Sequence, residues 1–146
     1  MTMTRSTVDA PVRRRTGRPG SLEWDKEGVA LFTVRASDEL PAGVVLEGAP
    51  TVRVDRLTLG SEPEDWTDVT SDFSISGIAI VDAVADDETT ILGVNQAVQF
   101  TIAADPGVEP DETDEPTPGD EYRVVITATR SDAGEWVGKV PLIIHF

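Results

Sequence analysis

The chain has 146 residues but contains no cysteine, a single histidine, two lysines and only 5% aromatic residues. The lack of cysteine excludes a disulfide scaffold, a thiol nucleophile and cysteine-ligated zinc. One histidine, His145, argues against a histidine-rich metal site. No apolar run approaches the roughly 20 residues of a membrane span, and the first residues lack the apolar segment of a signal peptide. We therefore expect a protein without a disulfide, a cofactor or a membrane partner.

The sequence also lacks the short motifs that carry common chemistries. It has no G-x-S-x-G nucleophile elbow, no G-x-x-x-x-G-K phosphate loop and no G-x-G-x-x-G turn. Carboxylate pairs occur throughout so acidic a chain, so they do not single out a glycosidase site. His145 lies in an apolar segment, where a structural role is the simplest interpretation. The sequence predicts that this protein is not an enzyme.

Charge is distributed unevenly along the chain. The 27 acidic and 12 basic residues give a net charge of −15, which argues against nucleic acid as a partner of the main body. Residues 1–20 differ from the rest because they contain five basic side chains and one acid, Asp9. The five basic residues are Arg5, Arg13, Arg14, Arg15 and Arg18.

Residues 1–20 have few large apolar side chains and cannot bury enough surface to fold alone. We expect a basic, extended N-terminal arm that is separate from a domain at residues 21–146. One interpretation of this arm is a disordered tail. The other is an arm that becomes ordered on an acidic partner surface or on a neighbouring copy, with its five arginines binding the partner.

The remaining sequence predicts β-strands rather than helices. Alternation is clearest in Ala97–Ala103, which places Val98, Phe100 and Ile102 on one face. No window of 12 or more residues has the apolar spacing of a helix. Gly, Pro and Asp separate the other strand-like segments, which are Ala30–Arg35, Thr51–Leu59, Trp66–Thr70, Phe73–Ile75, Gly77–Val84, Thr89–Leu92, Glu121–Arg130 and Glu135–Phe146.

This series of strands predicts an all-β fold. Seven or eight short strands in a single domain are typical of an immunoglobulin-like β-sandwich. A jelly roll or a small barrel is the alternative. The Cys–Trp–Cys arrangement of antibody domains is absent, so the expected likeness concerns the architecture alone.

An acidic, proline-rich loop at residues 104–120 suggests a metal site. Calcium prefers clustered carboxylate oxygens, and the candidate ligands are Asp111, Glu112, Asp114 and Glu115. The EF-hand pattern fails, because the twelfth residue counted from Asp111 is Tyr122 and not glutamate. Proline also stiffens the loop against wrapping an ion. We therefore expect a solvated loop that binds no metal.

Candidate interface residues come from the dispersed tryptophans and from the apolar C-terminal strand. Tryptophans spread in this way are more often core or interface anchors than a sugar-binding platform. Pro141 within the last strand indicates an edge position, and an edge strand can pair with a partner chain. The interface candidates are Trp24, Trp136, Ile143 and Phe146.

The C-terminal half resembles a known family. The run Pro118–Glu135, closing with Val140–Phe146, resembles the end of immunoglobulin-like domains: G-x-x-Y, an apolar strand, a short turn with glycine, and a last strand. Leu40–Gly43 is similar to that family's L-x-x-G turn, and Gln96–Ala103 stands where its penultimate hairpin strand would be. The acidic insertion Pro106–Thr117 departs from the tight turn that is usual there.

Such domains recur in small structural proteins of tailed viruses of bacteria or haloarchaea, among them capsid decoration and fibre-adaptor proteins. The resemblance implies a structural component of the virion without catalytic activity. Within that class we expect a capsid decoration or stabilising protein that binds the major capsid protein through its arm and edge strands. We further expect synthesis in the host cytoplasm, a place on the capsid surface of the virion, and a homo-oligomer, with a trimer as the expected form. A tail or connector protein is one alternative. A calcium-dependent adhesion or carbohydrate-binding module is the alternative from another class.

Overall fold

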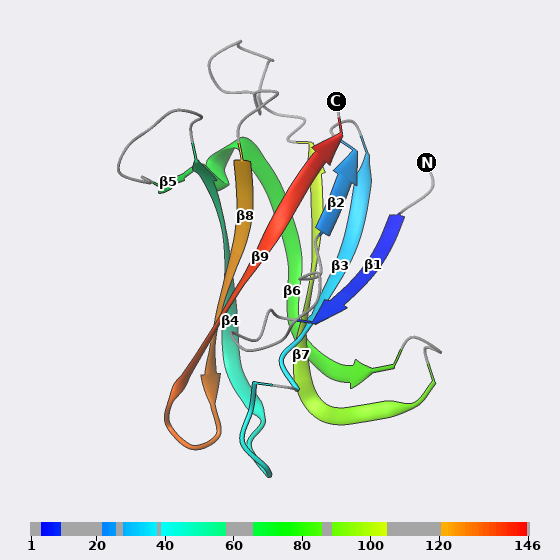
Figure 1. Cartoon of the computed structure of the whole chain (residues 1–146), viewed down its shortest axis with the longest axis vertical. Coiled ribbons are helices and arrows are strands. Elements are labelled where there is room, and N and C mark those ends of the chain that lie inside the picture. The colour runs from blue at the N-terminus through cyan, green and yellow to red at the C-terminus, as the bar shows by residue number, and fades with distance from the viewer. Residues whose placement is uncertain are drawn as a thin grey trace.

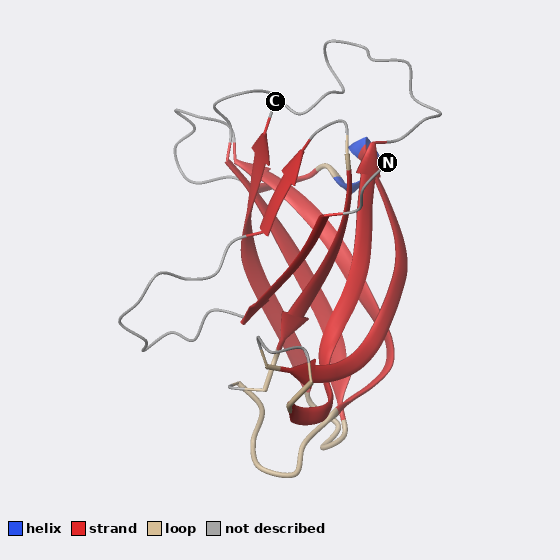
Figure 2. Cartoon of the chain, turned by 90° about the vertical axis from the view of Figure 1, so that its right-hand side faces the viewer, coloured by secondary structure: helices blue, strands red, loops and turns tan. Residues whose placement is uncertain are grey.

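The computed structural model describes residues 4–9, 22–25, 28–37, 39–57, 66–85, 89–104 and 121–145. Within these residues, nine strands form two mixed sheets that face each other (Figures 1 and 2). One sheet has the order β1 (Thr4–Asp9), β3 (Val29–Arg35), β7 (Ile91–Ala104), β6 (Phe73–Val84). The other has the order β2 (Leu22–Asp25), β9 (Glu135–His145), β8 (Glu121–Arg130), β4 (Leu46–Leu57), β5 (Trp66–Asp68). A 3₁₀ turn, η1 (Thr70–Asp72), precedes β6. The prediction of an all-β sandwich is confirmed.

The strand order is that of an immunoglobulin-like sandwich. β3, β7 and β6 lie in the order of strands B, E and D, and β9, β8 and β4 lie in the order of strands G, F and C. The two sheets are separate, unlike a closed barrel. Tyr122 stands at the start of β8, which is where a tyrosine marks strand F in that architecture.

The core lies between the two sheets, where alternate residues of each strand point inward. Phe32 of β3 and Phe100 of β7 are fully buried cross-strand partners whose ring centroids lie 5.8 Å apart. Toward one end of the core, Phe73 contacts both Trp24 and Tyr122, at centroid distances of 5.5 and 6.3 Å. Ring pairs of this kind stabilise a core beyond the apolar area that they bury.

The separate-arm prediction for residues 1–20 is wrong for Thr4–Asp9. These residues form β1, which pairs in parallel with β3 from Thr4↔Ala30 to Asp9↔Arg35, and Val8 packs against the core. The backbone ladder holds this strand, so its side chains need no alternating pattern. Arg5 is therefore on a sheet edge, whereas Arg13, Arg14, Arg15 and Arg18 lie outside the described residues.

The structure also corrects two of the four interface candidates. Trp24 is 2% exposed and its indole Nε1 donates a hydrogen bond to the Gly28 carbonyl at 3.0 Å. Trp136 is 4% exposed and lies over Gly138, where an added Cβ would be 2.6 Å from its ring. Both tryptophans belong to the core because their strands point them between the sheets. Ile143 is exposed as expected, and Phe146 lies outside the described residues.

Candidate functional site: the loop end and the projecting hairpin

Two connections lie together at one end of the sandwich, at the bottom of Figure 1. They are the described residues 36–37 and 39–45 between β3 and β4, and 131–134 between β8 and β9. Ser131 and Val45 exchange two hydrogen bonds, since each backbone N–H donates to the other residue, at 2.8 and 3.0 Å. Gln96 of β7 joins the same cluster, because its side chain donates to the Val44 carbonyl at 3.0 Å. These bonds fix the loops relative to one another.

The ends of β6 and β7 project from the sandwich as a curled hairpin (Figure 1). The β6–β7 ladder changes register between Ser76 and Ala79, and again between Val81 and Val84. Asn95 has a positive φ of 54°. Bulges bend a strand and increase its local twist, so they turn the hairpin out of the plane of the sheet. The regular part of β7, from Ala97 onward, stays in the sandwich.

Hydrogen bonds hold the projecting hairpin at its base. Arg35 is 8% exposed, and its Nη1 donates to the Val84 carbonyl at 2.8 Å. Across the hairpin, Asp82 Oδ1 accepts the backbone N–H of Asn95 at 3.0 Å. At the hairpin turn, the N–H of Ala85 donates to the Thr90 carbonyl at 2.8 Å. Arg35 therefore anchors the β6 side of the projection to β3, and the other two bonds join the two sides of the hairpin.

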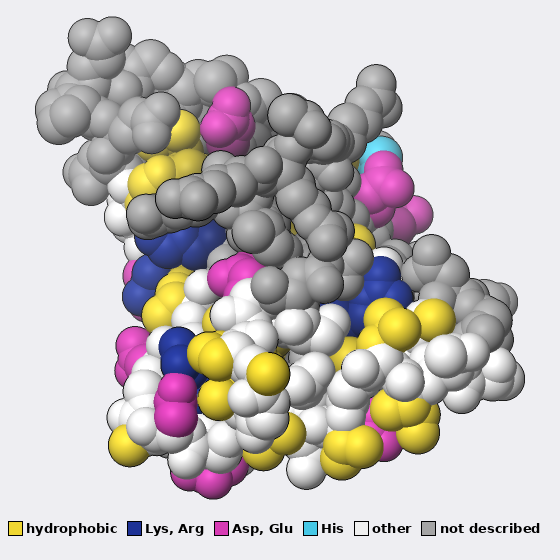
Figure 3. Space-filling model, turned by 60° about the horizontal axis from the view of Figure 1, so that its bottom comes forward, with side chains coloured by type: hydrophobic (Ala, Val, Ile, Leu, Met, Phe, Trp, Pro, Cys, Tyr) yellow, Lys and Arg dark blue, Asp and Glu magenta, His cyan; other side chains and the backbone are white. Residues whose placement is uncertain are grey.

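Apolar side chains cover the projecting end of β7. Ile91, Leu92 and Val94 are 56%, 53% and 56% exposed. Neighbouring residues of a strand point to opposite faces, so both faces of the hairpin present apolar surface to solvent. Figure 3 shows hydrophobic side chains gathered on this end of the molecule. Contiguous exposed apolar surface of this kind marks an interaction site more often than isolated residues do.

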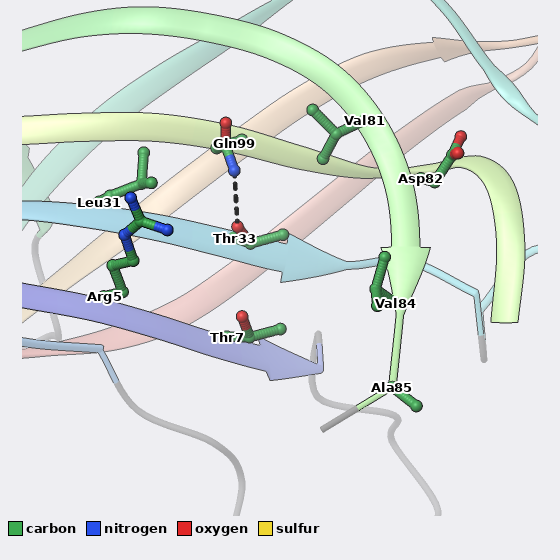
Figure 4. A pocket seen from close by; sticks show the side chains of 9 residues that line it. All are labelled: Arg5, Thr7, Leu31, Thr33, Val81, Asp82, Val84, Ala85 and Gln99. Carbon is green, nitrogen blue, oxygen red and sulfur yellow. Dashed lines mark hydrogen bonds between the residues drawn. The ribbon is translucent and has the colours of Figure 1, made fainter. Parts of the chain in front are cut away.

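A pocket of about 290 Å³ lies on the outer face of the four-stranded sheet (Figure 4). Leu31, Thr33 and Gln99 form its floor, and the Gln99 side chain donates to the Thr33 hydroxyl at 3.3 Å. β1 forms one wall and the curled end of β6 forms the other. The remaining lining residues are Arg5, Thr7, Val81, Asp82, Val84 and Ala85. Arg5, expected in a partner-binding arm, is thus a wall of this pocket.

A charged cluster covers the outer face of the five-stranded sheet. Asp55 is 2% exposed and accepts hydrogen bonds from Arg53 Nε at 2.8 Å and from Arg123 Nε at 3.1 Å. The bond to Asp55 raises the pKa of Arg53 above its ordinary value. Arg123 also lies over the ring of Trp66, with 4.1 Å between the guanidinium carbon and the centroid. These contacts join β4, β8 and β5, so we assign the cluster a role in sheet stability.

Two aspartates hold turns through local hydrogen bonds. Asp68 accepts bonds from the hydroxyl and the backbone N–H of Thr70, which lower the pKa of Asp68. Asp132 accepts bonds from Arg130 and from the N–H of Gly134, which lower the pKa of Asp132. The turn at Asp132 lies at the loop end of the sandwich. The Asp132 carboxylate therefore fixes the connection between β8 and β9.

The structure does not test the metal prediction for the acidic loop. In the described parts of the chain, no cluster of three histidine, aspartate or glutamate side chains could hold a metal ion. Asp111, Glu112, Asp114 and Glu115 lie outside those parts. Within the same residues, no helix has the length and apolar character needed to cross a membrane.

The sequence does not predict the exposed apolar end of this hairpin. It predicts Thr89–Leu92 only as a short strand. The run from Ile91 to Val94 holds three apolar residues without polar alternation, a pattern that usually indicates a strand buried on both faces. The local sequence therefore carries no signal of the exposure.

Comparison with known proteins gives little further information. No known protein family and no curated protein matches the sequence. A cysteine protease inhibitor from Entamoeba histolytica has a TM-score of 0.40 and 10% sequence identity to this chain. The alignment covers 98% of this chain and 97% of the inhibitor. At that score the likeness assigns no function to this protein.

Proposed function

We propose that this protein is a non-enzymatic structural component of a virus particle that binds another particle protein through the projecting β6–β7 hairpin. The single observation that carries the binding role is the exposure of Ile91, Leu92 and Val94 on an anchored projection. An element that is already ordered loses little conformational entropy on binding. Apolar side chains on such an element supply the association energy once a partner covers them.

The virion setting rests on the sequence resemblance to immunoglobulin-like domains of tailed viruses. The strand order of the sandwich and the position of Tyr122 agree with that architecture. Decoration of the capsid, with the major capsid protein as the partner, is the form of this role that the sequence favours. A tail or connector position is the alternative within the same class. The number of copies in each particle separates the two.

A binding assay with particles depleted of this protein tests the proposal. Leu92→Asp places a charge on the apolar hairpin end, where the side chain is exposed and the fold tolerates it. Ile143→Asp is the matched control, because Ile143 is a similarly exposed apolar residue on the five-stranded sheet. We expect the Leu92 variant to keep its melting temperature and to lose attachment, while the Ile143 variant attaches like the wild type.

Two results would contradict the proposal. Attachment of the Leu92 variant at wild-type occupancy would remove the hairpin as the binding element. Failure of the wild type to attach to depleted particles would remove the virion role itself.

A further inference from the structure

In the part of the chain that the structure describes, one edge of β9 has no neighbouring strand over more than half of its length. β8 pairs with β9 from Glu135 to Leu142, whereas β2 pairs with the other edge only from Leu142 to His145. Figure 1 shows β2 beside the C-terminal end of β9. Among the described residues, none pairs with this second edge between Glu135 and Pro141. The expectation that the edge at Pro141–Phe146 takes a partner chain is thus corrected, since β2 occupies it from Leu142 onward.

Pro141 shows which backbone groups of the open segment point outward. Proline has no N–H, so it fits the ladder opposite Arg123 only where its nitrogen points away from β8. The direction alternates from residue to residue along an antiparallel pair. The backbone groups of Glu135, Val137 and Lys139 therefore point away from β8 as well. Each of these three residues offers one N–H and one C=O to a further strand.

The side chains of the same three residues are self-complementary. All three are exposed on the outer face of the five-stranded sheet, Val137 by 41%. Glu135 and Lys139 stand two residues to either side of Val137 and carry opposite charges. Two copies that pair in antiparallel fashion about Val137 would place each Glu135 opposite Lys139 of the second copy. Opposite charges in directly facing positions stabilise a strand pair, and like charges destabilise it.

We propose that the edge Glu135–Lys139 of β9 binds a second copy of this chain about a twofold axis at Val137. The two β9 strands then form a continuous sheet across both copies, with the same patch used on each side. The length of the open edge fits this arrangement. Ala133 of the second copy, which is in the β8–β9 turn, would stand opposite Pro141, so the pairing ends just before β2 begins at Leu142.

An unpaired edge is the competing explanation, because lysine and proline also occur on strand edges that remain free. Reversing the charges of Glu135 and Lys139 distinguishes a free edge from a dimer. Glu135→Lys alone would face lysine with lysine across the interface, and Lys139→Glu alone would face glutamate with glutamate. In a mixture of these two variants, every facing pair across a heterodimer is again of opposite charge. The double variant Glu135→Lys/Lys139→Glu restores the complementarity within a homodimer.

Sedimentation velocity of the purified full chain over a concentration series, at fixed salt, measures the association. We expect the wild type and the double variant to dimerise with similar strength. Each single variant should dimerise roughly tenfold or more weakly, and their equimolar mixture should recover a dimer. Circular dichroism and melting temperature serve as fold controls, because both side chains are exposed.

Three outcomes would overturn the inference: a wild type that stays monomeric at every concentration, a trimer, or a dimer whose strength the single reversals leave unchanged. The experiment uses no virus particles. Its failure would therefore leave the proposed virion role standing, and a failed particle assay would leave this dimer standing.

Discussion

Substitution of Phe100 by alanine tests the arrangement of the core most simply. Phe100 of β7 has no solvent exposure and faces Phe32 of β3 across the ladder, with the two rings tilted by 56°. Removal of a buried phenylalanine leaves a cavity and costs about 3–5 kcal/mol of unfolding free energy. Loss of the ring pair, worth about 0.5–1.5 kcal/mol, places this site toward the upper end of that range. For a domain of this size we expect a melting temperature lower by on the order of 10–20 °C.

Urea unfolding followed by tryptophan fluorescence measures this change. Thr101→Ala is the matched control, because Thr101 is the next residue of β7 and points to the outer face. The control should stay within about 0.5 kcal/mol of the wild type. A Phe100→Ala protein that unfolds within about 1 kcal/mol of the wild type, with an unchanged denaturant slope, would refute the core packing and the register of β7.

Three further predictions concern the charged cluster, one turn and the last strand. Asp55→Ala should lower the free energy of unfolding by about 1–3 kcal/mol, because Arg53 and Arg123 lose charge-assisted bonds. Their side chains are 47% and 21% exposed, so water replaces part of that loss. An unchanged urea unfolding curve would contradict this prediction. The pKa of Asp68 is lower in the folded protein than in the unfolded chain, where it is about 3.9. Asp68 therefore stabilises the fold above the unfolded pKa, and this stabilisation is lost as the pH falls through the folded pKa. Asp68→Asn should therefore flatten the fall in stability below about pH 4, and a pH series that runs parallel to the wild type would be the contrary result. Gly138→Ala should lower the free energy of unfolding by about 1–3 kcal/mol, because the added Cβ would displace the ring of Trp136. An unchanged melting temperature would show that the ring moves freely.

The long strands could be predicted from the sequence because burial imposes a period of two. Val98, Phe100 and Ile102 point inward as expected, and so do Val52 and Val54. β1 and β2 were not predicted. They are short and pair in parallel with β3 and β9. β2 buries alternate residues, Leu22 and Trp24, but four residues are too few for a period of two to stand out in the sequence.

The burial of Asp55 and the exposure of Ile91 could not be predicted for a related reason. Asp55 is on the polar face of β4, where Arg123 of the neighbouring strand contacts it in addition to Arg53 of the same strand. Ile91 and Leu92 are exposed because register shifts turn the end of the hairpin away from the sheet. Both effects depend on which strands become neighbours, and that information is absent from a local pattern.

The virion role is the central claim, and the copy number of this protein in purified particles tests it most directly. Quantitative mass spectrometry of particles from the source culture would measure this chain against the major shell protein. A ratio near one, or a simple fraction of it, is the result that the capsid decoration role predicts. A few copies in each particle would place the protein in the tail or connector instead, and its absence from purified particles would contradict the virion role.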